Sequence, residues 1–359
     1  MLDSSFKKAV KNAIDKNAEY GYTGILDISG GADSRMIAYA ANELGCENIL
    51  GCHYSQSGSY EEKASEAVAK RLGIPLVIQH LDDAQFLEEA DVITRMNSGT
   101  AYYCGITGGK RLLESLREYN PGIEFTGLLG NVLDGGMVTE HGDEIPSLEH
   151  GQFVVCPTVD RTGMELDLPL LSRFKTNDMF WLYTRGMLCG MSTFLTRQNY
   201  VEPYTPYGDT EFIQAWLSIP WKKKVREKIL LRWMQRVYPD SMNIMYASLG
   251  YPLKRELSPF WTSPPVRRAT ALKNRLGWKL GLFRKIDMNP FYKWEKEKEW
   301  LQTWLEQYYT SSIEKLSSQS AVSEQLLEEL EKVYKNDTST VAKYLVITLL
   351  SYIQLYILP

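Results

Sequence analysis

Two adjacent glycines flanked by hydroxyl and carboxylate side chains give this sequence its clearest potential for chemistry. They lie in DISGGADSR, at 27–35, between the apolar run 23–28 and a helical pattern. Glycine allows backbone N–H groups to approach a ligand closely, and a helix N-terminus adds partial positive charge. Ser29 and Ser34 offer hydroxyl donors, and the Asp33 carboxylate suits Mg²⁺. The combination favours a pyrophosphate-binding loop.

The loop matches neither of two common phosphate-binding motifs. It lacks the Gly-Lys-Ser/Thr ending of a Walker loop and the spacing of G-x-G-x-x-G. A simpler interpretation stays open, in which 28–34 is a tight strand-to-helix turn whose Ser or Asp side chain caps the helix.

Apolar strands and amphipathic helices alternate around this loop. The predicted strands are 23–28, 48–54, 74–80 and 123–128, and the predicted helices are 4–17, 34–44, 60–72 and 111–119. The alternation predicts an α/β fold with a parallel sheet and helices on both of its faces. Such sheets bind ligands at the carboxyl ends of their strands, which is where the loop lies.

The pattern becomes mostly helical after about residue 170. The predicted helices there are 179–191, 211–218, 224–237 and most of 295–359, with a polar loop at 311–323. We therefore predict two lobes, 1–170 and 171–359, the second of them helical.

The composition is that of an ordinary globular protein. The 359 residues carry a net charge of −4, which disfavours a general nucleic-acid binder. Five cysteines without metal-binding or paired spacing predict free thiols and a cytoplasmic location. The most apolar segment, 341–358, is short for a membrane span and contains Lys343 and Gln354. We expect it to be a buried terminal helix, and we do not expect an integral membrane protein.

The motif S-G-G-x-D-S after a strand resembles the pyrophosphate loop of the N-type ATP pyrophosphatases. Three later segments are similar to the synthetase domain of asparagine synthetases and to its relative, β-lactam synthetase. They are HYSQSGSYEEKASEAVAKRLGIP (53–75), GLLGNVLDGG (127–136) and VEPYTPYGD (201–209). The resemblance extends in order over about residues 4–252, and the set is more specific than any single motif.

The resemblance implies a fold, a reaction and cofactors. The fold would be adenine nucleotide alpha hydrolase-like, with 1–170 as the nucleotide-binding lobe and 171–359 completing the substrate site. A carbon–nitrogen ligase of this kind would use ATP and Mg²⁺ to adenylate a carboxylate and release pyrophosphate. The acyl group would then pass to ammonia or an amine. The substrate would be a small-molecule or peptide carboxylate, in surface-polysaccharide or peptide tailoring.

The resemblance also assigns residues to roles. Glu202 takes the position of the family's catalytic glutamate and would position or deprotonate the amine. ATP would contact the two loops and the second strand. The ATP-binding residues would be Ser29, Gly30, Gly31, Asp33, Ser34, His53, Gly130 and Asn131, and the Mg²⁺ ligands would be Asp33, Asn131 and Asp134.

Two positions depart from the family pattern. Asn131 replaces an aspartate of the family loop, and Asp134 either substitutes for that carboxylate or is a turn residue. Ser248 replaces a lysine that stabilises negative charge at the α-phosphate. Lys254 is the candidate for that catalytic role. Arg35 is either another cation of the site or a charge on the helix surface.

The source of ammonia is a further difference from asparagine synthetases. Their glutaminase domain has a cysteine directly after the initiator Met, whereas this chain has Leu2. We expect no glutaminase domain, so ammonia would come from solution or from a separate glutaminase subunit. Two alternatives stay open. A non-catalytic ATP-binding subunit is favoured by Asn131 and Ser248, and a tRNA-modifying N-type pyrophosphatase is disfavoured by the cysteine spacing and the acidic pI.

A basic and aromatic segment covers 251–294. One interpretation is a binding surface for an anionic carrier or for a membrane. The other is the solvated face of one or two helices that pack through their aromatic rings.

Overall fold

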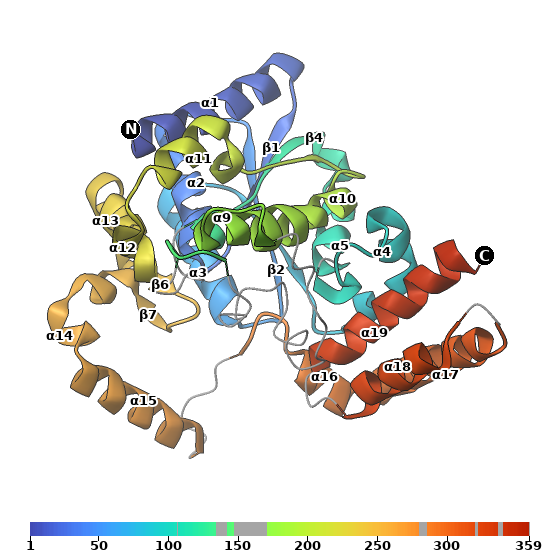
Figure 1. Ribbon diagram of the computed structural model, residues 1–359. Coiled ribbons are helices and arrows are strands. Elements are labelled where there is room, and N and C mark those ends of the chain that lie inside the picture. Colours follow the sequence, from blue (N-terminus) through green and yellow to red (C-terminus); the bar gives the residue numbers. More distant parts are fainter. Residues whose placement is uncertain are drawn as a thin grey trace. The chain divides into compact units, whose positions relative to one another are not determined.

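The computed structural model describes seven stretches of the chain (Figure 1): 1–105, 107–133, 142–146, 171–279, 286–319, 322–336 and 340–358. Contacts separate two compact units, each assembled from three segments. Unit 1 comprises Met1–His80, Leu116–Gly142 and Val201–Met288, and unit 2 comprises Leu81–Ser115, Asp143–Tyr200 and Asn289–Pro359. This division differs from the predicted lobes 1–170 and 171–359, because a strand beyond residue 200 completes the sheet that starts at residue 23.

Unit 1 is built on a five-stranded parallel sheet, and the sequence predicted a parallel sheet with four of these strands. Its strands are β1 (Thr23–Asp27), β2 (Ile49–Ser55), β3 (Leu76–His80), β4 (Pro121–Phe125) and β5 (Glu202–Tyr204), in the spatial order β3-β2-β1-β4-β5. The chain proceeds from β1 to β3 and then returns to the other side of β1 for β4. The carboxyl ends of β1 and β4 therefore flank the point where the strand order reverses, and open parallel sheets bind ligands at such points.

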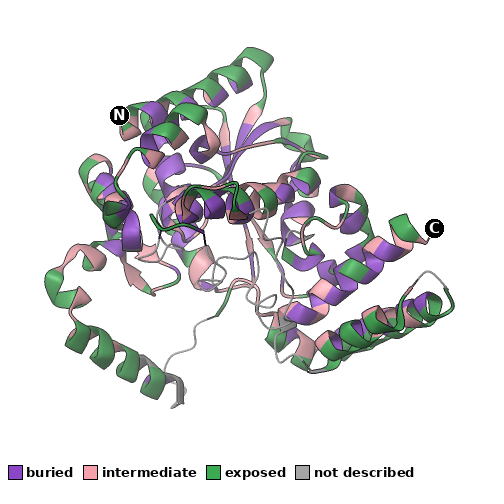
Figure 2. Ribbon diagram, in the orientation of Figure 1, coloured by how far each residue is buried: buried purple, intermediate pink, exposed green. Residues whose placement is uncertain are grey.

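The central strand is apolar because both of its faces are covered (Figure 2). Gly24, Ile25 and Leu26 are consecutive in β1 and all are buried, although neighbouring residues of a strand point to opposite faces. The edge strand β5 was not predicted. Its sequence is Glu-Pro-Tyr, which is too short and too polar to give a strand pattern.

Three long helices pack with the sheet. They are α1 (Leu2–Tyr20), α2 (Ala32–Glu43) and α3 (Tyr60–Leu72). Helix α3 has the predicted bounds because both of its ends carry a stop signal. Ser59 caps the first turn by accepting a hydrogen bond from the Glu62 N–H at 3.0 Å, and Gly73 ends the helix with a φ of 68°.

The rest of unit 1 is mostly helical, and an aromatic cluster joins it to α1. The ring of Phe6 lies 5.0–5.6 Å, between centroids, from the rings of Tyr207, Phe212 and Trp233. The elements are η3 (Arg117–Tyr119), α6 (Gly130–Leu133), η7 (Pro206–Gly208), α11 (Thr210–Leu217), α12 (Trp221–Lys224), η8 (Val225–Glu227), α13 (Lys228–Val237), η9 (Pro239–Asn243), the antiparallel pair β6 (Met245–Tyr246) and β7 (Tyr251–Pro252), η10 (Leu253–Leu257), α14 (Pro259–Thr262) and α15 (Pro264–Lys279).

Unit 2 is helical. Its elements are η1 (Gln85–Glu88), α4 (Ala90–Asn97), η2 (Tyr103–Gly105), α5 (Thr107–Ser115), α9 (Asn177–Trp181), η5 (Leu182–Gly190), η6 (Met191–Thr193), α10 (Phe194–Arg197), α16 (Phe291–Glu297), α17 (Glu299–Ser317), α18 (Glu324–Asn336), α19 (Thr340–Tyr352) and η11 (Ile353–Ile357). The terminal helix α19 is buried through Ala342, Tyr344 and Ile347, as predicted. Among the described residues, no helix combines the length and the apolar character needed to cross a membrane.

The polar loop predicted at 311–323 is wrong in its first part, because α17 continues to Ser317. Ser312 is buried, and its hydroxyl lies 2.6 Å from the Tyr308 carbonyl and 2.7 Å from the side-chain nitrogen of Gln354. A serine that donates to the preceding turn fits inside a helix. Ser312 therefore packs within unit 2, and the first part of the serine-rich segment does not interrupt the helix.

Candidate functional site

The glycine loop lies between β1 and α2, at the carboxyl edge of the sheet. Its two serines bind each other, with 2.8 Å between their hydroxyl oxygens. The Ser29 N–H donates to the Ser34 hydroxyl at 3.1 Å, and the Gly31 N–H donates to the Ser29 hydroxyl at 3.2 Å. These bonds fold residues 29–34 into a compact turn.

The Gly30 N–H binds an anion that belongs to the chain itself. It donates to a carboxylate oxygen of Glu61, in the first turn of α3, at 2.5 Å. A Cβ atom at Gly30 would lie 2.6 Å from that oxygen and 2.3 Å from the Cβ of Ala247. Only glycine therefore allows this approach. The sequence predicted that the loop binds an anion, but it did not predict that Glu61 supplies one. The available signal was the position of Glu61 after strand β2, in the first turn of a helix capped by Ser59.

The loops after β1 and β4 meet at the reversal of strand order. A Cβ atom at Gly130 would lie 2.2 Å from the carboxyl carbon of Asp33, and one at Gly127 would lie 3.0 Å from the Ser34 nitrogen. The structure thus brings together the predicted residues Gly130 and Asp33. The side chain of Asn131 and all of Asp134 lie outside the described residues.

Asp33 carries a buried carboxylate oxygen. Its Oδ1 atom has no hydrogen-bond partner among the described residues, while its backbone carbonyl accepts from the Tyr207 hydroxyl at 3.0 Å. Burial, together with the negative charge of Glu227, raises the pKa of Asp33 to about 8. Burial also raises the pKa of Glu227. A buried carboxylate in these surroundings needs a cation to ionise, so Asp33 fits a Mg²⁺ ligand.

A complete protein cage for a metal is absent from the described stretches. They contain no group of three or more His, Cys, Asp or Glu side chains arranged around one point. Mg²⁺ often takes only one or two protein carboxylates and completes its shell with phosphate oxygens and water. Asp33 therefore fits a metal that arrives with a phosphate.

His53 supports the loop from β2. Its two ring nitrogens lie 2.9 Å from the Ile28 carbonyl and 3.1 Å from the Ser55 hydroxyl. Burial lowers the pKa of His53 to about 4, so the ring is neutral near pH 7. The sequence predicted His53 as an ATP contact. That contact stays a prediction, since the family's strand ends contribute to the adenine pocket largely through backbone groups. Both ring nitrogens have partners within the protein, so the side chain is a positioning group for the end of β1.

Arg35 is fully buried, so the surface charge offered as one interpretation is wrong. Its guanidinium lies 3.4 Å from the Gly30 carbonyl and donates to the carbonyls of Ser241, Ile244 and Met245 at 2.9, 3.2 and 2.8 Å. Burial lowers the pKa of Arg35 to about 10, which leaves it charged at neutral pH. It therefore ties the loop to a segment two hundred residues later in the chain.

The segment tied by Arg35 continues into the β6–β7 hairpin. The Ala247 N–H donates to the Gly30 carbonyl at 3.2 Å, and Ser248, the position of the family's lysine, follows it and is exposed. Lys254, in η10, is also exposed, and no hydrogen bond or ion pair involves its side chain within the described residues. The structure therefore gives no support to Lys254 as the replacement cation.

Glu202 does not lie at the carboxyl edge of the sheet, where its predicted role would need it. It is the first residue of β5 and pairs with Ile123 in the middle of β4, whereas the loop follows the carboxyl end of β1. Its carboxylate is exposed and binds Lys16, in α1, at 2.6 Å. The segment VEPYTPYGD (201–209) does reach the loop, but through Tyr207, whose hydroxyl donates to the Asp33 carbonyl. The sequence predicted no contact between Tyr207 and Asp33.

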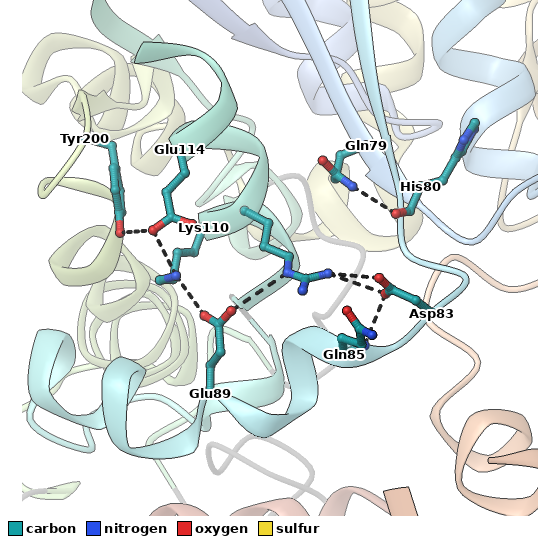
Figure 3. A network of polar contacts seen from close by, with 9 residues as sticks. Gln79, His80, Asp83, Gln85, Glu89, Lys110, Glu114 and Tyr200 are labelled. Carbon is teal, nitrogen blue, oxygen red and sulfur yellow. Dashed lines mark hydrogen bonds and ion pairs between the residues drawn. The ribbon is translucent and has the colours of Figure 1, made fainter. Parts of the chain in front are cut away.

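Unit 2 contains a second cluster of charges (Figure 3). The buried ammonium of Lys110 lies 2.8 Å from Glu89 and 2.9 Å from Glu114, and Tyr200 donates to Glu114 at 2.9 Å. Burial favours the neutral amine, but the bonds to the two carboxylates outweigh it and raise the pKa of Lys110. Because Lys110 binds both carboxylates at once, the cluster serves as a structural network.

The comparisons with known proteins identify no relative of this chain. No protein-family model matches the chain, and no curated protein matches it. Its function is therefore inferred from its own residues.

Proposed function

We propose that this chain binds ATP and Mg²⁺ at residues 28–34 and adenylates a carboxylate, as an asparagine-synthetase-like carbon–nitrogen ligase of the ATP pyrophosphatase type. The contact between Gly130 and Asp33 carries the proposal. It joins the loops after β1 and β4 where the strand order reverses, and ligands of open parallel sheets bind at that position.

Backbone groups of the loop would hold the phosphates. The N–H groups of Gly30 and Gly31 and the N-terminus of α2 present partial positive charge to an anion. The Gly30 N–H already binds the Glu61 carboxylate, which supports an anion site there. The hydroxyls of Ser29 and Ser34 would exchange their mutual hydrogen bond for bonds to phosphate oxygens.

The proposed Mg²⁺ would neutralise negative charge on the phosphates. Asp33 would hold it through the buried Oδ1 atom, and the pairing would lower the pKa of that carboxyl. By the resemblance, Asn131 and Asp134 would supply further oxygens. Tyr207 and Gly130 would fix Asp33 from two sides, one by a hydrogen bond and the other by close packing.

The second half of the proposed reaction transfers the acyl group to ammonia or an amine. A small-molecule or peptide carboxylate would be the acyl donor, and ammonia would come from solution or from a separate glutaminase subunit. In this proposal the loop contributes alignment of the carboxylate with the α-phosphate. Glu202 is not assigned a step, because its exposed carboxylate binds Lys16. Lys254 is not assigned one either, because no contact joins its exposed side chain to the loop within the described residues.

The exposed ion pair of Glu202 with Lys16 favours one second candidate, a non-catalytic ATP-binding subunit. Both candidates predict nucleotide binding at the same loop. They differ in whether a carboxylic acid makes the protein incorporate labelled pyrophosphate into ATP.

The deciding experiment is a pyrophosphate-exchange screen over carboxylic acids with ATP and Mg²⁺. We expect exchange with at least one acid, and we expect Asp33→Asn to abolish it. The matched control is Asp15→Asn, which alters an exposed carboxylate on α1 and should leave exchange unchanged. ATP binding without exchange for any acid would support the second candidate. Exchange that persists in Asp33→Asn would exclude the proposed site.

A further inference from the structure

Helices α14 and α15 expose apolar side chains to an unusual degree. Phe260 and Trp261 are 64% and 42% exposed, and Leu272 and Leu276 are 58% and 50% exposed. Figure 2 shows α15 green along almost its whole length. A helix of this length is marginal in water without a packed face. We call residues 259–279 the α14–α15 surface.

The exposed apolar residues of α15 lie on one stripe. Pro265, Ala269, Leu272 and Leu276 are separated by steps of four, three and four residues, which places them on one face of an α-helix. The same periodicity places Arg268 and Arg275 on one flank of the stripe and Lys273 on the other. The helix therefore has an apolar line between two basic margins.

The charge around this stripe has one sign. Residues 259–279 contain five Lys or Arg residues and no Asp or Glu, in a chain whose net charge is −4. Arg267 is turned away from the stripe and is paired with Glu256 at 2.6 Å. The basic margins are therefore complementary to a partner with negative charge above an apolar layer.

We propose that the α14–α15 surface docks the protein on an anionic phospholipid bilayer. A bilayer offers acyl chains to Leu272 and Leu276 and phosphate groups to Arg268 and Arg275, and basic amphipathic helices bind in this way. A nucleic acid would neutralise the arginines but would leave both leucines in water. The docking is independent of the proposed ligase reaction, since no residue of this surface belongs to the loop at 28–34.

The test is co-sedimentation of the full chain with vesicles of phosphatidylcholine that contain about 30% phosphatidylglycerol. We expect binding to these vesicles and much weaker binding to phosphatidylcholine alone. Leu272→Ser/Leu276→Ser should reduce the partition coefficient about tenfold or more, and Arg268→Gln/Arg275→Gln should reduce it to a similar degree at about 0.1 M salt. The matched control is Leu188→Ser/Leu349→Ser, because these leucines are 52% and 41% exposed and lie in unit 2.

Three results would overturn the proposal. The first is equal binding to neutral and anionic vesicles, and the second is unchanged binding of the Leu272→Ser/Leu276→Ser variant. The third is that the protein does not bind vesicles but self-associates or binds RNA, and that the Leu272→Ser/Leu276→Ser variant loses this interaction. Such a result would assign the surface to a second copy of the chain or to a nucleic acid. Because all the substituted side chains are exposed, the melting temperature should stay unchanged and report that each variant is folded.

Discussion

The Glu61 carboxylate lies 2.5 Å from the Gly30 backbone nitrogen, so the helix after β2 supplies an anion to the loop after β1. The two strands are parallel neighbours, which brings these two loops to the same edge of the sheet. A phosphate bound at the Gly30 N–H would have to displace this carboxylate. Glu61 is therefore a built-in competitor for the proposed ligand.

Replacing Glu61 by glutamine should tighten ATP binding. The amide keeps an oxygen for the Gly30 N–H but removes the negative charge, which at about 4 Å from a phosphate costs about 1 kcal/mol even in water. We expect the Kd for ATP, measured by calorimetry, to fall about fivefold or more. Glu66→Gln, at an exposed position of the same helix, is the control and should have no effect. Weaker binding in Glu61→Gln would show that the carboxylate assists the ligand.

A methyl group at Gly130 should damage the contact between the β1 and β4 loops. Its Cβ would lie 2.2 Å from the carboxyl carbon of Asp33, so one of the two loops must move. We expect Gly130→Ala to lower stability by about 1–3 kcal/mol in urea denaturation and to weaken ATP binding. Gly190→Ala is the control, because its Cβ would meet only an ordinary contact at 3.4 Å. Full ATP binding in Gly130→Ala would refute the importance of this contact.

His53 should make the folded state sensitive to acid. Its pKa is 6.5 in the unfolded chain and about 4 in the folded protein, so between these values the unfolded chain binds the extra proton. The free energy of unfolding therefore keeps its full value above about pH 6.5. It falls as the pH drops towards 4, by up to about 3 kcal/mol. His53→Gln should flatten this part of the stability curve, whereas His80→Gln, at an exposed ring, should preserve it. An unchanged slope in His53→Gln would contradict the assignment.

Removing Lys110 should destabilise unit 2 strongly. The side chain is 7% exposed and faces the carboxylates of Glu89 and Glu114. Lys110→Met would remove this cation from both, and Glu89 would keep only Arg111, at 3.8 Å. Breaking a buried ion pair from one side costs about 3–5 kcal/mol. The control Lys335→Met removes an exposed pair with Glu331 and should cost less than about 1 kcal/mol. Similar losses in the two variants would mean that the Lys110 network contributes little.

The central part of the fold was predictable because its signals are local. Strands with both faces buried give continuous apolar runs, and α3 has a serine cap and a terminal glycine that fix its ends. Strand β5 has no such signal, since three residues form it and the sheet around them decides their conformation. The boundary predicted at residue 170 differed from the observed units for the same reason.

The candidate site was predictable at the loop and not beyond it. The segment VEPYTPYGD identifies Glu202 by its position in the sequence. The position of Glu202 along the sheet depends instead on strand register, which the segment does not encode. Arg35 is a charged residue next to a polar loop, and such a position gives no sign of burial. Its partners are carbonyls of Ser241, Ile244 and Met245, and no local pattern encodes so distant a contact.

The interleaving of the two units has a consequence for synthesis on the ribosome. The chain passes between units five times, and 76 residues lie between Phe125 at the end of β4 and Glu202 at the start of β5. At ordinary rates of translation, the outer edge of β4 waits roughly 4–15 s for its partner strand. A nascent chain or a fragment ending at residue 170 therefore presents an open strand edge, which is a template for aggregation.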